Sequence, residues 1–280
     1  MKILVTGATG NVGRMVVDEL LARGATDVRA LTVNPAAAGL PGEVEVVRGF
    51  LGRLETVPAA LAGVDAMYLA PHPATVFEVC RLAAEAGVRR IVDMAGAKGG
   101  TWQVIEDGVE ASGVAYTHLE PGEFMANSTL WAAQIRAGDV VRDAYGDVVN
   151  APIAQEDIAA VAAHVLLCGA SGAFTGSADA SDAFVGASIE LTGPEALSRR
   201  EMVAAIGRAL GRDLTYVELT GDAAAEHFSG VMGSYGQWYL DGLAQLAQHP
   251  QAAVSTVADL LGRPAMTYGE WAGRHADLFR

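Results

Sequence analysis

Three glycines at intervals of three residues stand near the start of the chain, within the stretch TGATGNVG at positions 6–13. In such a turn Gly7 lets the chain turn sharply, Gly10 lets a ligand approach the backbone, and Gly13 lets the next helix pack on the strand. The free N–H groups at the start of that helix bind phosphate groups. The loop follows the apolar residues 2–6 and opens an amphipathic stretch, which is the context that the motif requires. We therefore predict a turn that holds the pyrophosphate of NAD or NADP.

The predicted cofactor site takes in further strand ends, because ligands of open parallel sheets bind outside the carboxyl ends of the strands. NAD(P)(H) is the predicted cofactor. The predicted cofactor-binding residues are Gly7, Thr9, Gly10, Asn11, Val12 and Gly13 in the loop, Thr32 and Asn34 at the second strand, Ala70 and Pro71 at the fourth, and Met94 at the fifth. No spacing of cysteine and histidine suggests a metal site, and none is predicted.

A carboxyl group past the sixth predicted strand is the candidate for catalytic acid–base chemistry. Glu123 stands two residues after Pro121, at a strand end that should face the cofactor. Apolar neighbours would desolvate the carboxyl group and raise its pKa toward neutrality, where a general acid or base is most effective. A solvent-facing or helix-capping Glu123 is the alternative. The predicted substrate pocket consists of Trp102, Phe124, Met125, Trp131, Tyr235 and Trp238.

The elements that position these residues alternate strictly between strand and helix. Predicted strands cover 2–6, 27–32, 44–48, 65–70, 89–94 and 114–119. Predicted helices between them cover 11–23, 53–62, 74–86 and 102–112. This order predicts an α/β fold, a doubly wound parallel sheet of the Rossmann type. A helix at 154–168 and a surface excursion at 169–187 then lead to a last strand at 188–192.

Beyond residue 193 the pattern becomes mostly helical. Predicted helices cover 198–210, 221–228, 235–247, 253–261 and 267–279, with one strand at 214–218. We expect Trp271 and Phe279 to lie in the core of this part, because they share one helix face. The predicted domains are an NAD(P)-binding Rossmann domain at 1–193 and a small substrate or lid lobe at 194–280, with contributions from about 124–137.

The composition narrows the choice of partners. The formal net charge of −14 disfavours nucleic acid and anionic membranes, so neither is a predicted partner. The chain opens on a strand rather than a signal peptide, and no apolar run approaches the length of a membrane span. We therefore expect a cytoplasmic protein, a monomer or homodimer, whose partner is a small-molecule substrate.

Several stretches along the chain resemble one family. They are TGATGNVGR at the start, PGEFMAN at 121–127, QIRAGDVV at 134–141, API and EDIAAVA within 151–162, LTGPEALS at 191–198, and LLGRPAMTYGEWAGRHADLF at 260–279. Together they are similar to the NmrA-like family of the atypical short-chain dehydrogenase/reductase superfamily. The resemblance implies a Rossmann domain, a small C-terminal lobe and substrate in the cleft between them. It also implies NAD(P)H-dependent reductase, quinone reductase or redox-sensing activity.

The chain departs from this family in the residues around the cofactor. The second strand of relatives often ends in an arginine that pairs with the 2′-phosphate of NADP, and here the matching residue is Val33. The loss of a guanidinium–phosphate pair makes a preference for NADP doubtful. Arg14, one residue past the loop, is a possible substitute. Gly49-Phe50 replaces the Gly-Asp that relatives commonly place near the adenine.

The catalytic pair of the superfamily is absent. That pair is a tyrosine followed four residues later by a lysine, which share one helix face. The chain has only two lysines, Lys2 and Lys98, and the residue four before Lys98 is Met94, so the pair cannot exist. Glu120 also replaces the arginine that relatives place before the proline after the sixth strand.

The leading interpretation is an NAD(P)H-dependent NmrA-like oxidoreductase for a small, largely apolar carbonyl, quinone or polycyclic substrate. An acceptor that is already activated needs no tyrosine, since the cofactor supplies the hydride and the protein supplies orientation. Two alternatives stay open. One is a redox sensor that binds NAD(P) without turnover, and the other is a non-redox isomerase, cyclase or dehydratase that uses Glu123.

Overall fold

A seven-stranded parallel sheet is the centre of the first of two compact units. The computed structural model describes residues 1–96, 99–168 and 184–280, and this sheet is formed within them. From one edge to the other its strands are β3 (Glu45–Arg48), β2 (Val28–Thr32), β1 (Ile3–Val5), β4 (Ala66–Leu69), β5 (Arg90–Met94), β6 (Ala115–Pro121) and β9 (Ala187–Leu191). Every pairing is parallel, which confirms the predicted α/β doubly wound fold.

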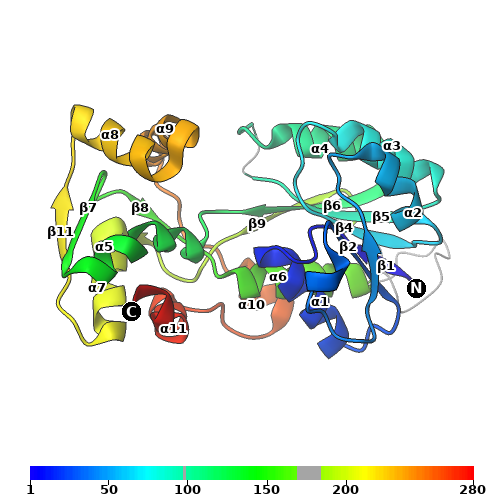
Figure 1. The fold of residues 1–280 in the computed structure, drawn as a ribbon, viewed down its shortest axis with the longest axis horizontal. Coiled ribbons are helices and arrows are strands. Elements are labelled where there is room, and N and C mark those ends of the chain that lie inside the picture. The colour runs from blue at the N-terminus through cyan, green and yellow to red at the C-terminus, as the bar shows by residue number, and fades with distance from the viewer. Residues whose placement is uncertain (97–98, 169–183) are drawn as a thin grey trace. The chain divides into compact units, whose positions relative to one another are not determined.

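Helices cover both faces of this sheet (Figure 1). α1 (Asn11–Ala22) and α6 (Gln155–Cys168) pack together on one face. On the other face lie α2 (Val57–Leu61), α3 (Val76–Glu85) and α4 (Gln103–Glu110). The core beneath the second group includes the fully buried Met67 and Ile91, and burial of such side chains stabilises the unit by about 1.5–3 kcal/mol each.

The strand order reverses beside β1, which pairs with β2 on one side and β4 on the other. β1 is therefore the switch point of the sheet, where the crossovers turn to opposite faces and leave a crevice at the strand ends. The glycine loop that follows β1 lies at this point.

The first unit comprises Met1–Pro121, Gln155–Leu191 and Asp259–Gly262, and the second comprises Gly122–Ala154, Thr192–Ala258 and Arg263–Arg280. The second unit contains two small sheets, one of β10 (Leu197–Ser198) with β8 (Val149–Asn150) and one of β11 (Thr215–Glu218) with β7 (Val140–Asp143). Its helices are α5 (Ala132–Ala137), α7 (Arg199–Leu210), α8 (Gly221–Met232), α9 (Gly236–Gln248) and α11 (Tyr268–Arg274), with α10 (Thr256–Leu261) divided between the units.

Parts of the second unit differ from the predicted elements. It takes in Gly122–Ala154, whereas the sequence assigned only about 124–137 of this stretch to the lobe. The helix predicted at 267–279 ends at Arg274, and a 3₁₀ turn at Ala276–Phe279 follows it. Trp271 and Phe279 lie in the core, which confirms that expectation. Most of the excursion predicted at 169–187 lies outside the described residues.

Candidate functional site

The glycine loop has the backbone geometry of a ligand cradle. Gly7 has a φ of +60°, a left-handed conformation that a side chain would strain, and a Cβ there would lie 2.9 Å from the Cβ of Ala70. A Cβ on Gly13 would overlap the carbonyl oxygen of Gly7, so only glycine lets α1 start this close to the strand. The Gly10 N–H donates to the same carbonyl at 2.8 Å and closes the turn.

Two threonines tie this loop to the sheet. Thr6 Oγ1 donates to the carbonyl oxygen of Tyr68 at 3.0 Å and accepts the N–H of Ala70 at 2.8 Å. Thr9 Oγ1 lies 3.1 Å from Thr32 Oγ1, at the end of β2. The structure thus brings together the predicted cofactor residues of the loop with those at the ends of β2 and β4. Thr6 was not among the predicted residues.

The start of α1 presents its N–H groups without a competing cap. The N-cap residue is Gly10, which has no side chain to accept a hydrogen bond from the first turn. Thr9, Gly10 and Asn11 are exposed, so a ligand can reach these groups. An uncapped helix start with its positive dipole end attracts an anion, and the space left by the glycines admits it. This cradle therefore fits the pyrophosphate of a dinucleotide.

The end of β2 carries no positive side chain of its own. Val33 is 62% exposed there, and Asn34 follows it as the residue before a 3₁₀ turn. The Arg14 guanidinium reaches across from α1 and donates to the carbonyl oxygens of Ala38 and Gly39 in the loop after β2. Arg14 is therefore the cation that the structure places against this loop.

An aromatic pair lies past the ends of β3 and β4. The Phe50 ring is 43% exposed and meets the His72 ring edge to face at a centroid distance of 5.1 Å. His72 Nδ1 is 2.7 Å from Thr75 Oγ1, which itself donates to the carbonyl oxygen of Leu51. Phe50 thus presents an oriented, accessible ring at the position where relatives carry a carboxylate.

At the end of β5 the superfamily's catalytic groups are missing, as the sequence required. Met94 Sδ accepts the Tyr68 hydroxyl at 3.7 Å, and Trp102 is 36% exposed before the start of α4. Lys2 is held at the other end of β1 by Glu45, at 2.8 Å, and Asp27, at 3.0 Å. The second lysine, Lys98, lies outside the described residues.

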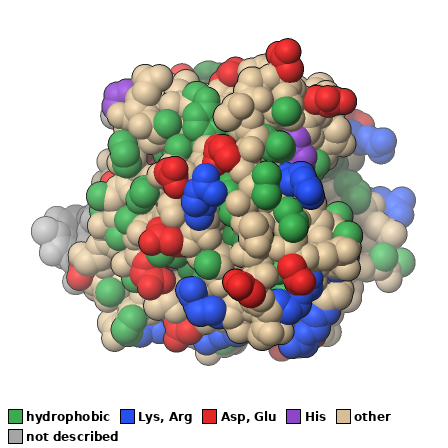
Figure 2. Space-filling view, turned by 90° about the vertical axis from the view of Figure 1, so that its left-hand side faces the viewer, with side chains coloured by type: hydrophobic (Ala, Val, Ile, Leu, Met, Phe, Trp, Pro, Cys, Tyr) green, Lys and Arg blue, Asp and Glu red, His purple; other side chains and the backbone are tan. Residues whose placement is uncertain are grey.

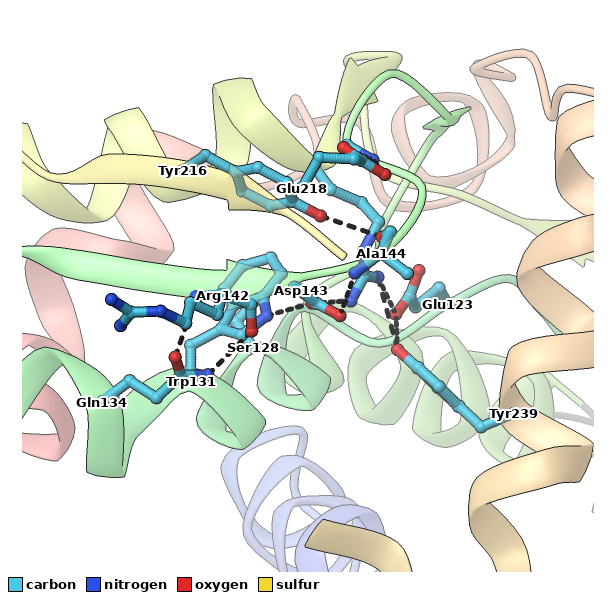
Figure 3. A network of polar contacts seen from close by, with 12 residues as sticks. Glu123, Ser128, Trp131, Gln134, Arg142, Asp143, Ala144, Tyr216, Glu218 and Tyr239 are labelled. Carbon is cyan, nitrogen blue, oxygen red and sulfur yellow. Dashed lines mark hydrogen bonds and ion pairs between the residues drawn. The ribbon is translucent and has the colours of Figure 1, made fainter. Parts of the chain in front are cut away.

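Glu123 belongs to a polar network in the second unit (Figure 3). Its carboxylate accepts the Tyr239 hydroxyl at 2.7 Å and the Asn150 side-chain amide. Arg199 Nη1 lies 3.7 Å from the same carboxylate. The Glu123 side chain is 12% exposed, so all these contacts are made in a poorly solvated environment.

Arg199 is the centre of this network. It is 1% exposed and pairs with the fully buried Asp143, whose carboxylate also accepts the indole N–H of Trp131 (Figure 3). Burial by itself lowers the pKa of Arg199, but Tyr239 and the two carboxylates raise it overall, so its charge is permanent. A buried cation with two anionic partners satisfies the requirement that buried charges be paired.

The predicted substrate-pocket residues are divided between the units. Trp102 is in the first unit, and Phe124, Met125, Trp131, Tyr235 and Trp238 are in the second. Met125 and Trp131 are 1% and 2% exposed and pack in the core, Trp131 because its indole N–H is satisfied by Asp143. Tyr235 and Trp238 are 69% and 47% exposed.

Several residues of the network were not singled out from the sequence. Arg199, Asp143 and Asn150 come from three separate elements, and Tyr239 was predicted only as part of the helix at 235–247. The glycine-rich residues before it are mostly helical, and a Cβ on Gly236 would lie 2.5 Å from the Phe228 backbone, so only glycine fits where α9 starts beside α8. The one signal in the sequence was the capping box at Ser198 and Glu201, which fixes where α7 begins.

On the side where α7, α8 and β11 lie, acidic, basic and apolar side chains are interspersed (Figure 2). Within the described part of the chain, no helix combines the length and the apolar character that crossing a membrane requires. In the same residues, no group of three or more His, Cys, Asp or Glu side chains has an arrangement suited to a metal ion.

Comparison with known proteins places the chain among nicotinamide-dependent enzymes. A family model described as NAD(P)H-binding matches residues 7–168. Over 99% of both chains, the protein is 36% identical to the (4-alkanoyl-5-oxo-2,5-dihydrofuran-3-yl)methyl phosphate reductase of Streptomyces griseus and 30% identical to the NAD(P)H azoreductase of Xenophilus azovorans. An NADPH-dependent quinone oxidoreductase from Escherichia coli, solved with NADPH, has the same fold with a TM-score of 0.83 at 23% identity, covering 98% of this chain and 99% of that chain.

These similarities extend over the whole chain, and the family model covers more than half of it. They confirm the predicted NAD(P)(H) cofactor, the predicted class of NAD(P)H-dependent oxidoreductase, and the resemblance to the atypical short-chain dehydrogenase/reductase superfamily. The glycine cradle after β1 is where the family's cofactor would bind. The chain belongs to the NAD(P)H-binding family of this superfamily.

Proposed function

We propose that the protein reduces a small, conjugated and electron-poor acceptor, such as an unsaturated lactone, an enone or a quinone, with NAD(P)H as the hydride donor. The observation that carries this proposal is the absence of a tyrosine–lysine pair, which holds over all 280 residues of the sequence. A simple ketone needs a protein acid at its oxygen when hydride arrives, whereas a conjugated acceptor spreads the developing charge over its own π system.

The pKa values of Tyr68 and Tyr239 support a conjugated acceptor as the substrate. Burial raises the pKa of Tyr68 and of Tyr239, and the nearby Glu123 raises the pKa of Tyr239 further. A lysine in the usual pair has the opposite effect, because a positive charge favours the phenolate. Tyr239 is therefore a hydrogen-bond donor that orients Glu123 rather than a replacement for the missing catalytic tyrosine.

The names of the relatives agree with an acceptor of this class. An alkanoyl dihydrofuranone, an azo compound and a quinone, the acceptors that those names indicate, all carry double bonds in conjugation. Bound NAD(P)H would supply the hydride, and the residues of the glycine cradle would hold the pyrophosphate. We propose the exposed aromatic side chains of Tyr235 and Trp238 as substrate contacts, since binding pockets are mostly apolar with aromatic walls.

The test is a turnover assay with NADH and NADPH against three panels: quinones, unsaturated lactones or enones, and unconjugated ketones. We expect steady loss of nicotinamide absorbance with the first two panels and little with the ketones. The matched control is Gly10→Ala, whose Cβ would lie 3.2 Å from the Gly7 carbonyl oxygen on the cradle side, so that the variant folds but loses the cofactor. Binding of NAD(P)H without oxidation by any acceptor would refute the proposal and favour a sensor.

The same assay addresses the choice of cofactor. With Val33 at the end of β2 and Arg14 engaged by two backbone carbonyls, we expect a small or reversed preference for NADPH over NADH. A missing charged hydrogen bond corresponds to about 1.5–3 kcal/mol, roughly tenfold or more in affinity. A preference above about a hundredfold that disappears in Arg14→Ala would show that Arg14 binds the 2′-phosphate.

A further inference from the structure

A second group of buried titratable side chains lies in the first unit, on the sheet face that α3 and α4 cover. Asp93 on β5 and His118 on β6 occupy paired positions in the sheet, and His118 Nδ1 is 2.6 Å from Asp93 Oδ2. The two side chains are 0% and 1% exposed. Glu120 points to the same face as His118, because side chains two apart on a strand share a face. Glu106 on α4 completes the group and is 2% exposed.

This group has more acids than it has cations. No arginine or lysine among the described residues hydrogen-bonds or ion-pairs with Asp93, Glu106 or Glu120. Among the residues that the structure describes, His118 is the one positively chargeable partner, and its Nε2 lies 3.6 Å from a fourth carboxylate, that of Glu110. Glu190, on β9 opposite Glu120, adds a further, exposed acid. If every carboxyl group were ionised, the charge of the imidazolium would fall far short of balancing them.

Several carboxyl oxygens of this group lack a hydrogen-bond donor, and protonation of the carboxyl groups would lower the cost of burying them. Among the described residues, Asp93 Oδ1, Glu106 Oε1 and Glu120 Oε1 are buried oxygens without a hydrogen-bond partner. The other oxygen of Glu106 accepts only the Gln103 side-chain amide, at 2.9 Å. A buried carboxylate oxygen with no donor is costly, whereas a protonated carboxyl group becomes a donor and needs less solvation.

The pKa shifts of the group also favour protonated side chains. Burial raises the pKa of Asp93, although the hydrogen bond from His118 opposes the rise. Burial also raises the pKa of Glu106, and the charges of Glu120 and Asp93 add to that rise. The pKa of His118 is raised as well, since the attraction of Asp93 and the other acids outweighs its burial.

Two further titratable groups lie near Asp93 and do not supply charge: Cys80 on the same face of the sheet, and Tyr68 on the opposite face. Burial raises the pKa of the Cys80 thiol, on α3, to about 12, and raises the pKa of the Tyr68 phenol, on β4, above its ordinary value. Both groups are neutral near pH 7. The remaining neighbour, Tyr116, stacks on His118 with ring centroids 4.4 Å apart and donates to Glu110.

The position of the group ties it to the reaction. Asp93 and Glu120 lie next to the last residues of β5 and β6, Met94 and Pro121, at the sheet edge where such folds bind the cofactor. Glu120 is half-buried, with its Oε1 enclosed and the rest of its side chain partly open to solvent. Glu120 is therefore the member of the group that lies between the buried carboxyl groups and the carboxyl end of β6.

We propose that Asp93, Glu106, His118 and Glu120 form a proton-holding cluster that donates the proton of the reduction, with Glu120 as its outlet; this inference rests on the proposed function. Reduction of a conjugated double bond adds one hydride to the carbon β to the carbonyl and one proton to the α carbon. Bound NAD(P)H would supply the hydride and would be released as NAD(P)⁺. The proton leaves the Glu120 carboxyl group, and the resulting carboxylate regains a proton from water through the cluster.

The first test asks whether the cluster holds an acid proton. Infrared spectra of the full chain in H₂O and D₂O at pH 7 should show the carbonyl stretch of a protonated carboxyl group, shifted by deuteration. The band should weaken or shift in Glu106→Gln and in Glu120→Gln. It should be unchanged in Asp107→Asn, because Asp107 is the next residue on α4 but exposed. Absence of the band in the wild type, or its persistence unchanged in both Gln variants, overturns the proposal.

The second test asks whether that proton reaches the substrate. With an enone and NADPH, kcat/KM should fall as pH rises through the pKa of the cluster. Glu120→Gln should lower turnover by about 10²–10⁴ and remove this limb while the Kd for NADPH stays the same. Asp107→Asn should keep both the rate and the limb. A Glu120→Gln variant with wild-type turnover and an intact limb overturns the donor role.

The two tests also separate this inference from the proposed function. If the wild-type protein oxidises NADPH with conjugated acceptors but Glu120→Gln is unaffected, only the cluster's donor role fails. If the wild type oxidises no cofactor with any acceptor, the proposed function fails and the donor role fails with it. In that case the infrared band alone decides whether the cluster holds a proton.

Discussion

In the second unit two carboxylates, those of Asp143 and Glu123, share one guanidinium, whereas in the first unit three buried or half-buried carboxyl groups share one imidazole. Arg199 stays charged at any pH at which the protein is folded, and its partners are each within 4 Å of it. His118 carries a charge only when it is protonated. The acids around it have oxygens for which the described residues provide no donor.

The comparison of the two clusters shows that burial alone does not determine the role of a charged cluster. A permanent cation keeps a counter-ion beside the carboxylates at every pH at which the protein is folded, which suits a part that must keep its shape. An imidazole surrounded by acids has a charge that follows pH, which suits a part that takes up and releases protons. Substitutions in either cluster should therefore have different effects on stability, turnover and pH dependence.

The largest effect is expected from Arg199→Met. Removal of the guanidinium leaves Asp143 buried without its counter-ion, and breaking a buried ion pair in this way costs about 3–5 kcal/mol of the free energy of unfolding. Urea denaturation followed by circular dichroism measures the loss. Arg200→Met is the matched control, because the neighbouring Arg200 pairs with Glu218 and Asp147 at the surface. We expect less than about 1 kcal/mol there. Equal losses in the two variants would mean that the buried network is not what stabilises the second unit.

Glu123→Gln asks in which of the two clusters proton transfer takes place. If Glu123 is an oriented member of the Arg199 network, the variant should keep the fold and lose less than about tenfold in turnover, since no rate-determining proton passes through it. If Glu123 is the acid or base that the sequence suggested, the loss should be about 10²–10⁴. Steady-state assays on Glu123→Gln and Glu120→Gln side by side distinguish the two outcomes.

Glu106→Gln should change how stability depends on pH. The folded-state pKa values of Asp93, Glu106 and His118 are raised, so the folded state binds more protons than the unfolded state. Their contribution is therefore present at low pH and is lost as pH rises through the folded-state values, by about 1.4 kcal/mol for each pKa unit.

Melting curves between pH 4 and pH 9 should show this decline in the wild type and a shallower one in Glu106→Gln. A difference in stability between the wild type and Glu106→Gln that does not change with pH would contradict the assignment of a raised pKa to Glu106.

The smallest effect is expected from Tyr239→Phe. The change removes one donor to Glu123 and leaves the Asn150 amide and Arg199 in place. The loss of one hydrogen bond corresponds to about 1 kcal/mol. Tyr235→Phe, at a side chain that is 69% exposed, should have no measurable effect on the free energy of unfolding. A loss of several kcal/mol in Tyr239→Phe would place the hydroxyl, rather than Arg199, at the centre of the network.

The elements that the sequence predicts correctly are those with a local pattern. The strands from β1 to β6 and the helices between them were predicted to within a few residues, because each is a local apolar pattern that ends at a turn residue. The glycine loop is equally local. β7 was missed, since its four residues, VVRD, pair with a strand more than seventy positions later.

The Glu123 network was invisible for the same reason. Glu123, Asp143, Arg199 and Tyr239 have no common spacing, and only the folded second unit brings them together. For Asp93 and His118 a signal did exist, because both strands were predicted and the register of adjacent parallel strands sets such residues side by side. Neither burial nor the missing counter-ions can be read from that register, so the chemistry of the cluster required the structure.

The ties of the glycine loop have a consequence for the speed and thermodynamics of cofactor binding. Thr6 fixes the loop to β4, Thr9 meets Thr32 at β2, and the Gly10 N–H closes the turn on Gly7, all from within the protein. A loop that already has its bound shape loses little conformational entropy when a ligand arrives. Association should therefore proceed in a single kinetic phase whose rate rises linearly with NAD(P)H concentration, without the plateau that a preceding loop rearrangement would impose.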